Sequence, residues 1–291
     1  MDREHRSAHG LKTRPRPFGP RGKDLEVGSR AHYTDAAYYT KTYRGRVEDV
    51  AYYVELARES GGPVLEYGCG NGRIALPIAR HGVEITGVDL SPTMVADLKQ
   101  RLASEYDFVR DLVRVRCGDM RKVRLRRRFP LVIVTFNSIL HLYERTDFEQ
   151  FFARVREHLT PDGRLVFDAS VPSPVDQIRK PERPYTIPRL RHPTTGKVIR
   201  YSERFDHDPS RQLLMVMMEF APVDAPDEAW ATPLAHRQLY PLETEALLHY
   251  NGFEVEKVEG DFEGGPLTRD SDVAIWTCRL AKGRRRASAS R

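Results

Sequence analysis

The segment Pro63-Val-Leu-Glu-Tyr-Gly-Cys-Gly-Asn-Gly-Arg-Ile-Ala-Leu-Pro-Ile-Ala79 decides the fold, because it reads as a short apolar strand, a glycine-rich turn and the start of a helix. The turn has glycine at alternate positions, Gly68, Gly70 and Gly72. Glycine adopts left-handed backbone conformations and lets a ligand approach where a Cβ would collide with it. The turn is therefore expected to touch a nucleotide-like ligand.

The spacing of these glycines differs from the dinucleotide fingerprint G-x-G-x-x-G, which would require a glycine at position 73. That position is Arg73, and the third glycine falls one residue earlier. In addition, Glu66 stands two residues before the first glycine. Its carboxylate would repel a pyrophosphate but would accept hydrogen bonds from an ammonium group or from ribose hydroxyls. The segment thus indicates a cationic ligand and not NAD.

The pattern Glu66-x-Gly68-x-Gly70-x-Gly72 resembles motif I of the class I S-adenosylmethionine-dependent methyltransferases. The resemblance implies S-adenosylmethionine as the cofactor and a Rossmann-like α/β fold. In that fold a seven-stranded, mostly parallel sheet has helices on both faces. A tight turn in some other α/β sheet is the alternative interpretation. The motif residues that the resemblance places at the cofactor are Glu66, Gly68, Cys69, Gly70, Asn71 and Gly72.

A second apolar run, Val83-Glu-Ile-Thr-Gly-Val-Asp89, follows at the spacing of a β-α-β unit and ends in an acid. In this fold such an acid binds both ribose hydroxyls, so Asp89 is the expected ribose ligand. An aspartate that opens a loop often caps the next helix instead. Here Ser91 can cap the helix expected over residues 92–101, which would leave Asp89 free. Two further expected cofactor contacts are Leu90 and Met94.

A third strand is expected at residues 113–117 and stops at Gly118-Asp119-Met120. The family resemblance places Asp119 beside the adenine amino group and Met120 against the face of the ring. Gly118 is included as a further cofactor contact.

A fourth run, Pro130-Leu-Val-Ile-Val-Thr-Phe136, leads into Asn137-Ser-Ile-Leu-His-Leu-Tyr143. Ligands in open α/β sheets bind at the carboxyl ends of the strands, so Phe136 and Asn137 are expected at the cofactor. A lone histidine between leucines is more often a core residue. This segment resembles the one in amino-sugar N,N-dimethyltransferases, where the histidine or its neighbours face the methionyl group. The resemblance makes His141 a candidate catalytic residue.

The residues before motif I are crowded with tyrosines, in the stretch Ala31-His-Tyr-Thr-Asp-Ala-Ala-Tyr-Tyr-Thr-Lys-Thr-Tyr43. One interpretation is that these rings pack on the sheet. In the family, however, this region forms a lid over the ligand, and a tyrosine at its end can reach the methyl donor. By their position before the following helix, Tyr39 and Tyr43 are candidate catalytic residues.

The chain of 291 residues is expected to hold one catalytic domain with a modest addition. Alternating residues at 197–205 and 212–220 predict a β-hairpin, which would stand over the carboxyl edge of the sheet and select the acceptor. The expected parts are a disordered basic leader (1–30), a lid and helix (31–62), the cofactor-binding core (63–170), a β insertion that caps the acceptor site (171–236), the end of the core sheet (237–281) and a disordered basic tail (282–291).

Composition narrows the partners. The net charge is +6, and the basic runs lack interleaved aromatic residues for base stacking, so nucleic acid is not the expected substrate. The chain has no run of 18 apolar residues and no signal-peptide pattern, which predicts a cytoplasmic protein without membrane contact. Its three cysteines lack metal-site spacing, so no metal is expected. Asp147 and Asp168 leave an acidic metal cluster open.

These features predict methyl transfer from S-adenosylmethionine to a nitrogen or oxygen atom of a small-molecule acceptor by in-line displacement. Positioning is expected to supply on the order of 7–11 kcal/mol of the acceleration, and a general base typically 10²–10⁴-fold. An amine needs only to arrive neutral, whereas a hydroxyl would need His141 or a lid tyrosine as proton acceptor. The alternatives are a methyltransferase acting on RNA or a peptide, and a non-catalytic S-adenosylmethionine-binding protein. Both a monomer and a homodimer are open.

Overall fold

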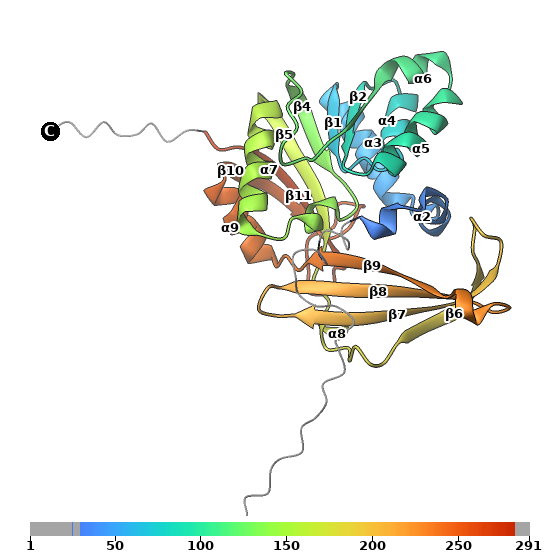
Figure 1. Ribbon diagram of the computed structural model, residues 1–291. Coiled ribbons are helices and arrows are strands. Elements are labelled where there is room, and N and C mark those ends of the chain that lie inside the picture. The colour runs from blue at the N-terminus through green and yellow to red at the C-terminus, as the bar shows by residue number, and fades with distance from the viewer. Residues whose placement is uncertain (1–24, 26–29, 283–291) are drawn as a thin grey trace, which may run out of the picture.

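The computed structural model describes Leu25 and residues 30–282. The expectations for residues 1–24, 26–29 and 283–291 lie outside the described residues. Figure 1 shows a central sheet between helices and a second sheet packed beside its lower end. In the part of the chain that is described, no helix is both long and apolar enough to span a bilayer.

The central sheet has seven strands in the order β10-β11-β5-β4-β1-β2-β3, and only β11 runs antiparallel to its neighbours. The predicted fold class is therefore confirmed. The strands are β1 (Val64–Tyr67), β2 (Ile85–Asp89), β3 (Val113–Cys117), β4 (Phe129–Val134), β5 (Leu159–Ser170), β10 (Phe253–Glu259) and β11 (Val273–Leu280).

Both faces of the central sheet are buried, which explains why its inner strands read as continuous apolar runs. Successive side chains of a strand point to opposite faces. In β4, Val132 and Val134 pack with α7 and α9, whereas Leu131 and Ile133 pack with α3 and α4. The main helices are α3 (Glu48–Ser60), α4 (Ala75–Arg80), α5 (Pro92–Ala103), α6 (Asp107–Leu112), α7 (Arg145–His158) and α9 (Pro241–Tyr250).

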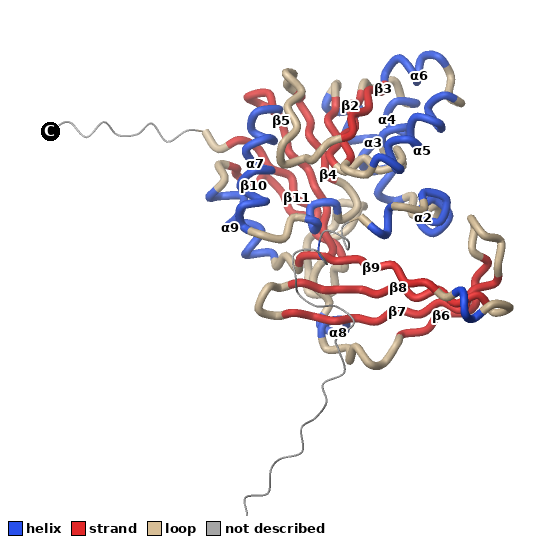
Figure 2. The backbone as a smooth tube through the Cα atoms, in the orientation of Figure 1, coloured by secondary structure: helices blue, strands red, loops and turns tan. Residues whose placement is uncertain are grey.

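The second sheet, called the cap sheet below, is antiparallel throughout in the order β6-β7-β8-β9. The hairpin expected from the sequence corresponds to its central strands, β7 and β8, and two further strands flank it. In Figure 2 its strands run across the direction of the central strands. The cap strands are β6 (Tyr185–Arg191), β7 (Val198–Asp208), β8 (Leu213–Pro222) and β9 (Trp230–Arg237).

The N-terminal lid joins the cap sheet to the central domain. It consists of the short 3-10 helix η1 (Ala31–Tyr33) and the helix α2 (Ala36–Tyr43). Tyr38 of α2 packs among Ile199, Tyr201 and Phe220 of the cap sheet. The strand β9 lies against η1 and against η2 (Ser138–His141), the turn that follows β4. The lid and the cap sheet therefore meet at the carboxyl edge of the central sheet.

Candidate functional site

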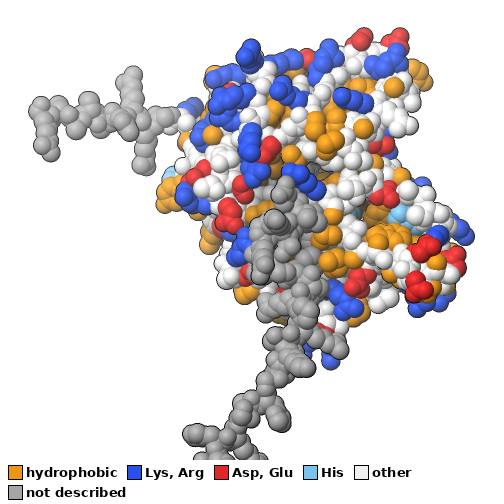
Figure 3. Space-filling view, viewed as in Figure 1, with side chains coloured by type: hydrophobic (Ala, Val, Ile, Leu, Met, Phe, Trp, Pro, Cys, Tyr) orange, Lys and Arg blue, Asp and Glu red, His pale blue; other side chains and the backbone are white. Residues whose placement is uncertain are grey.

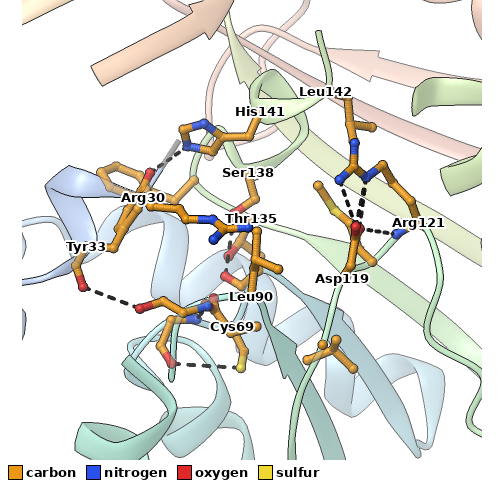
Figure 4. A pocket seen from close by; sticks show the side chains of 18 of the residues that line it. Arg30, Tyr33, Cys69, Leu90, Asp119, Arg121, Thr135, Ser138, His141 and Leu142 are labelled. Carbon is orange, nitrogen blue, oxygen red and sulfur yellow. Dashed lines mark hydrogen bonds and ion pairs between the residues drawn. The ribbon is translucent and has the colours of Figure 1, made fainter. Parts of the chain in front are cut away.

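A cavity of about 580 Å³ opens at the carboxyl ends of β1, β2 and β4, below the lid. Pockets that hold small molecules and cofactors fall in this range of volume. Figure 4 shows side chains from the loops after these strands and from the lid converging on it. The sequence-predicted residues that line it are Tyr39, Glu66, Gly68, Cys69, Gly70, Asn71, Asp89, Leu90, Gly118, Asp119, Met120, Phe136 and His141.

Four other predicted residues do not line this cavity. Met94 is fully buried in α5. A Cβ on Gly72 would collide with Leu98, so this glycine is needed for the packing of α5. The side chain of Asn137 accepts a hydrogen bond from the backbone N–H of Ser170 at 2.6 Å, which turns it toward β5. The fourth is Tyr43 of the lid.

Glu66 provides an unpaired acceptor in the cavity wall. The residue is 1% exposed, and Thr135 Oγ1 donates to its Oε1 at 3.0 Å. Among the described residues, its other oxygen, Oε2, has no hydrogen-bond partner. Desolvation raises the pKa of Glu66 to about 8. A buried acceptor without a partner is rare in proteins, so Oε2 fits a donor supplied by a ligand, such as an ammonium group.

The glycines of the turn serve different purposes. Gly70 has a φ of 51°, and a Cβ added to it would have no heavy atom within 4 Å, so it borders open space. Gly68 has a φ of 72°, and a Cβ there would collide with Ser138 at the start of η2. Gly70 thus leaves the backbone of the turn open to the cavity, and Gly68 lets the turn after β4 approach.

Asp89 is already engaged by the backbone. Its Oδ2 accepts from the N–H of Gly70 and its Oδ1 from the N–H of Ser91, each at 2.7 Å. Ser91 does cap α5, as expected, because its Oγ accepts from the N–H of Met94 at 3.3 Å. The expectation that this cap leaves Asp89 free is nevertheless wrong. A carboxylate has about four acceptor sites, so two are left for hydroxyl groups. Desolvation raises the pKa of Asp89, and the two N–H groups oppose that rise.

Asp119, after β3, is held by an arginine. Arg121 donates from Nε to Oδ1 at 2.9 Å and from its terminal nitrogen to Oδ2 at 2.7 Å. Desolvation raises the pKa of Asp119, but the Arg121 guanidinium outweighs it and lowers the pKa below its usual value. Arg121 also binds Asp147 at 2.5 Å, at the start of α7. No group of three or more His, Cys, Asp or Glu in the described ranges is placed to hold a metal ion.

The turn after β4 depends on Asp168, whose role the sequence did not indicate. Its carboxylate accepts from Tyr53 Oη at 2.6 Å and from the backbone N–H groups of Phe136 and Asn137 at 2.9 and 3.3 Å. These two residues have left-handed φ values of 52° and 64°. Such conformations cost of order 1–3 kcal/mol each and cluster at functional sites. In the sequence, Asp168 was singled out only as one of two acids that left a metal cluster open.

Phe136 borders the cavity and contacts two guanidinium groups. Arg73 and Arg46 lie over its ring, with 4.7 and 5.0 Å from the central carbon to the ring centroid. Arg73 is fixed by Asp49, which accepts from it at 2.8 and 2.5 Å. The residue that breaks the dinucleotide register therefore has a structural role, because it holds the aromatic wall of the cavity.

His141 is bonded on both ring nitrogens. Its Nε2 lies 2.7 Å from the hydroxyl of Tyr33 and its Nδ1 lies 3.3 Å from the hydroxyl of Tyr143. Desolvation, with smaller effects of His236 and His32, lowers the pKa of His141 well below its usual value. The imidazole is therefore neutral near pH 7. Tyr33 was not singled out in the sequence, because only the fold brings η1 beside η2.

Of the two lid tyrosines expected at the site, Tyr39 lines the cavity and Tyr43 does not. Tyr39 is buried and lines the cavity, and desolvation raises the pKa of its phenol. The hydroxyl of Tyr43 instead lies 3.1 Å from Nε2 of His32, within the lid. The ring of Tyr43 still packs on Phe136, with 4.9 Å between centroids.

A family model described as a methyltransferase domain matches residues 64–163, from β1 into β5. Those residues carry the unpaired carboxylate of Glu66, the open glycine turn and Asp89. Residues 64–163 form a methyltransferase domain. The resemblance to S-adenosylmethionine-dependent enzymes predicted from motif I agrees with this match and with a solved structure that binds S-adenosylmethionine, described below.

The curated relatives match less than half of the chain. One is dTDP-3-amino-3,6-dideoxy-alpha-D-glucopyranose N,N-dimethyltransferase of Streptomyces fradiae. It is 30% identical over 128 residues, which are 44% of this chain and 47% of that enzyme. Two putative methyltransferases, from Geobacillus sp. and Bacillus subtilis, are matched over 49% and 45% of their own lengths. The chain therefore spans about half the length of these curated relatives.

Solved structures extend the similarity beyond the methyltransferase domain. The CcbJ methyltransferase of Streptomyces caelestis superposes with a TM-score of 0.70 over 86% of this chain and 98% of its own. Its sequence is 24% identical, so this likeness concerns the fold alone. The glycopeptide N-methyltransferase MtfA complexed with S-adenosylmethionine is 26% identical, with a TM-score of 0.54 over 79% of this chain and 93% of its own.

Proposed function

We propose that this chain transfers a methyl group from S-adenosylmethionine to a nitrogen or oxygen atom of a small-molecule acceptor. The observation that carries the proposal is the unpaired Oε2 of Glu66 in the wall of the cavity. An ammonium group, such as that of the methionyl part of S-adenosylmethionine, would satisfy this buried acceptor. The ammonium group would favour the ionised form of Glu66, whereas that ionised form would repel a pyrophosphate.

Further residues of the cavity fit the rest of the cofactor. The free lone pairs of Asp89 suit two ribose hydroxyls, and Asp119 and Met120 suit the adenine ring. Leu90 is 40% exposed beside Asp89 and offers an apolar contact. We also assign Gly68, Cys69, Gly70, Asn71, Gly118 and Phe136 to the cofactor pocket, on the basis that they line the same cavity.

The protein's own contribution is mainly position and exclusion of water. Bound S-adenosylmethionine would supply a methyl group already activated by its sulfonium. The lid and the cap sheet meet at the edge of the central sheet where the cavity lies, and we assign the exclusion of solvent to them. Holding the reactants in line can contribute on the order of 7–11 kcal/mol. His141 is neutral near pH 7 and carries one lone pair, so it can accept a proton.

An amine is the acceptor we favour. The printed names of two relatives, an amino-sugar N,N-dimethyltransferase and a glycopeptide N-methyltransferase, support nitrogen as the methylated atom. The cap sheet lies outside the residues matched by the family model. Its strand β9 contacts η2, and His236 of β9 packs against the ring of His141. We assign the choice of acceptor to this sheet.

RNA is the alternative substrate that the basic segment 121–128 raises. Figure 3 shows Lys and Arg side chains spread over the upper part of the molecule. Within the segment 121–128, Arg124 is paired with Glu157 at 2.8 Å and Arg127 with Glu84 at 2.6 Å. Such pairing reduces the field available to phosphates, which supports a small acceptor over RNA.

The test is methyl transfer to a metabolite extract. The full chain is incubated with S-adenosylmethionine that carries an isotopically labelled methyl group, and products are identified by mass spectrometry. The proposal predicts a labelled small molecule together with S-adenosylhomocysteine. Label found only in added RNA or protein would favour the alternative substrates. Tight binding of the donor without any transfer would favour a non-catalytic binding protein.

A further inference from the structure

We infer that a second cavity, between the lid and the cap sheet, binds a neutral hydroxylated ring such as a sugar residue, and that its occupancy strengthens donor binding through the lid. It is called the lid–cap cavity below, and the cavity of about 580 Å³ at the carboxyl ends of β1, β2 and β4 is called the cofactor cavity. The inference goes beyond the proposed function, because binding in the lid–cap cavity requires no methyl transfer.

The lid is a wall between the two cavities. The lid–cap cavity has a volume of about 330 Å³ and shares no lining residue with the cofactor cavity. Pockets that hold small molecules begin near this volume. Tyr33 and Tyr39 line the cofactor cavity, whereas His32 and Tyr38 line the lid–cap cavity. The opposite side of the lid–cap cavity comes from β8, β9 and the turn after β6.

Two stacked pairs of rings form an apolar corner of the lid–cap cavity. Trp230 of β9 stacks on Phe220 of β8, with 5.2 Å between centroids and 8° between planes. Tyr38 of the lid stacks on His192 with 5.2 Å and 9°. The two pairs are nearly perpendicular, at 81° between His192 and Trp230 and 88° between Tyr38 and Phe220. Such rings offer large contact area with few rotatable bonds, which suits the C–H face of a sugar ring.

His192 provides a hydrogen-bond donor without a partner. The residue is 4% exposed, and its Nδ1 accepts from the backbone N–H of Thr195 at 3.4 Å. Desolvation lowers the pKa of His192, so the ring is neutral near pH 7 and carries its proton on Nε2. Among the described residues, no hydrogen bond reaches that Nε2. A buried donor without a partner is rare in proteins, so Nε2 fits an acceptor supplied by a ligand.

Asp35 provides an acceptor across a gap from His192. Its carboxylate is fixed, because it caps α2 by accepting from the N–H of Tyr38 at 2.8 Å and also accepts from the hydroxyl of Thr194 at 2.7 Å. Its Oδ2 lies 4.0 Å from Nε2 of His192, which is longer than a hydrogen bond. Both residues line the lid–cap cavity. A hydroxyl group can accept from His192 and donate to Asp35 at the same time.

Charge favours a neutral ligand. The described residues that line the lid–cap cavity include no Lys or Arg, so a phosphate or carboxylate would find no cation there and would face Asp35. A quaternary ammonium ion would suit the rings and Asp35, but it would leave the Nε2–H of His192 unpaired. The hydroxyls of Thr34, Thr195 and Thr232 add further polar groups to the lining. The chemistry that satisfies all of these groups is a neutral ring with several hydroxyls.

The lid couples the two cavities. A ligand bonded to Asp35 of the lid and to His192 beside the cap sheet would hold these two parts together. Within the lid, the ring of His32 packs on Tyr33 and Tyr39, with 5.2 and 6.0 Å between centroids. Those two tyrosines line the cofactor cavity. Fixing the lid on the cap sheet therefore favours the arrangement that completes the cofactor cavity, and linkage requires that each ligand strengthens binding of the other.

The experiment follows the two tryptophans of the full chain, Trp230 and Trp276, by nitrogen-15 NMR of their indole N–H groups. Trp276 stacks on Phe167 in the central sheet, with 6.3 Å between centroids, so it is an internal control. The probes are the methyl glycosides of glucose, galactose and mannose, together with choline and inorganic phosphate. We expect at least one glycoside to shift the Trp230 signal saturably and to leave Trp276 unchanged.

Two variants test the polar contacts. His192→Phe keeps a ring beside Tyr38 and removes the donor, so it should weaken glycoside binding about 10-fold. His249→Phe, at an exposed position of α9, is the matched control and should bind as the wild type does. Asp35→Asn keeps a residue that can cap α2 and should also weaken binding. Thermal melting verifies folding, and Asp35→Asn keeps the inference testable if His192→Phe does not fold.

Calorimetry with S-adenosylmethionine tests the coupling. Donor affinity should rise about 5-fold or more when the glycoside is saturating, and His192→Phe should lose this increase while it keeps the affinity measured without glycoside. Equal donor affinity with and without glycoside would overturn the coupling. A Trp230 signal that responds to no glycoside, or to choline or phosphate in their place, would overturn the site. A chain that binds glycoside and donor but methylates nothing would overturn the proposed function and leave this inference standing.

Discussion

The carboxylate of Asp89 accepts a hydrogen bond from the backbone N–H of Gly70, with 2.7 Å between Oδ2 and nitrogen. The acid at the end of β2 therefore fixes the glycine-rich turn after β1. Its other oxygen accepts from the N–H of Ser91, at the start of α5, also at 2.7 Å. The side chain of Asp89 thus connects the end of β2, the turn after β1 and the start of α5, and so fixes this wall of the cavity before any ligand is bound.

Asp89→Ala should weaken binding of S-adenosylmethionine by about 1.5–3 kcal/mol, the range for hydrogen bonds to a charged group. It should also lower the melting temperature, because the N–H groups of Gly70 and Ser91 lose their acceptor. Calorimetry and thermal melting measure the two effects. Asp89→Asn, which keeps one oxygen, should lose less of both. Unchanged affinity and unchanged melting in Asp89→Ala would refute the assignment.

Gly70→Ala should reduce donor affinity, because the new Cβ would occupy the open space that the ligand needs. The matched control is Gly61→Ala at the end of α3. Gly61 also has a left-handed φ, 68° against 51° for Gly70, and open space around an added Cβ. Each variant should lose about 1–2 kcal/mol of stability from the backbone conformation. Calorimetry should find lower affinity in Gly70→Ala only. An equal loss in both variants would place the ligand elsewhere.

Glu66 should make donor binding depend on pH. With its pKa raised to about 8 in the free protein, the carboxyl is mostly protonated at pH 7. A bound ammonium group lowers that pKa, so binding releases a proton and affinity rises as pH increases toward and past 8. Calorimetry in buffers of different ionisation enthalpy counts the proton. Glu66→Gln should abolish the dependence, whereas a wild-type affinity that is flat between pH 6 and 9 would contradict the role.

The histidines around η2 should make the protein sensitive to acid. Desolvation lowers the pKa of both His32 and His236 from 6.5 to about 4. The unfolded chain therefore takes up protons below pH 6.5 that the folded chain does not, and stability is lost as pH falls from about 6.5 through 4. Thermal melting should show a lower midpoint at pH 5 than at pH 7. His236→Gln should reduce that difference, and His81→Gln, at an exposed position, should not.

The sequence was a sufficient guide to the central sheet for physical reasons. Parallel strands buried on both faces must be apolar throughout, and the turn after β1 needs glycine where its φ is positive. Both requirements concern consecutive residues, so they can be recognised in the sequence as apolar runs and as closely spaced glycines. The cap sheet was only partly predicted, since its outer strands β6 and β9 contain Pro188 and Pro233 and do not alternate cleanly.

The end of the cavity that holds His141 was less predictable, because it depends on contacts between distant segments. Tyr33 and Tyr43 are both lid tyrosines, and nothing in their neighbours decides which one reaches His141. Only the fold places Tyr33 there and pairs Tyr43 with His32. The same holds for Asp168, whose three hydrogen bonds come from residues more than 30 positions away.

The most direct test of the central claim is calorimetry of the full chain with S-adenosylmethionine, S-adenosylhomocysteine and NAD under the same conditions. A bound ammonium group favours ionisation of Glu66, whereas a phosphate would be repelled by the ionised carboxylate. Arg73 takes the place of the third glycine of a dinucleotide turn while it binds Asp49. We predict that both adenosyl ligands bind and that NAD does not. Binding of NAD with equal or higher affinity would contradict the methyltransferase account.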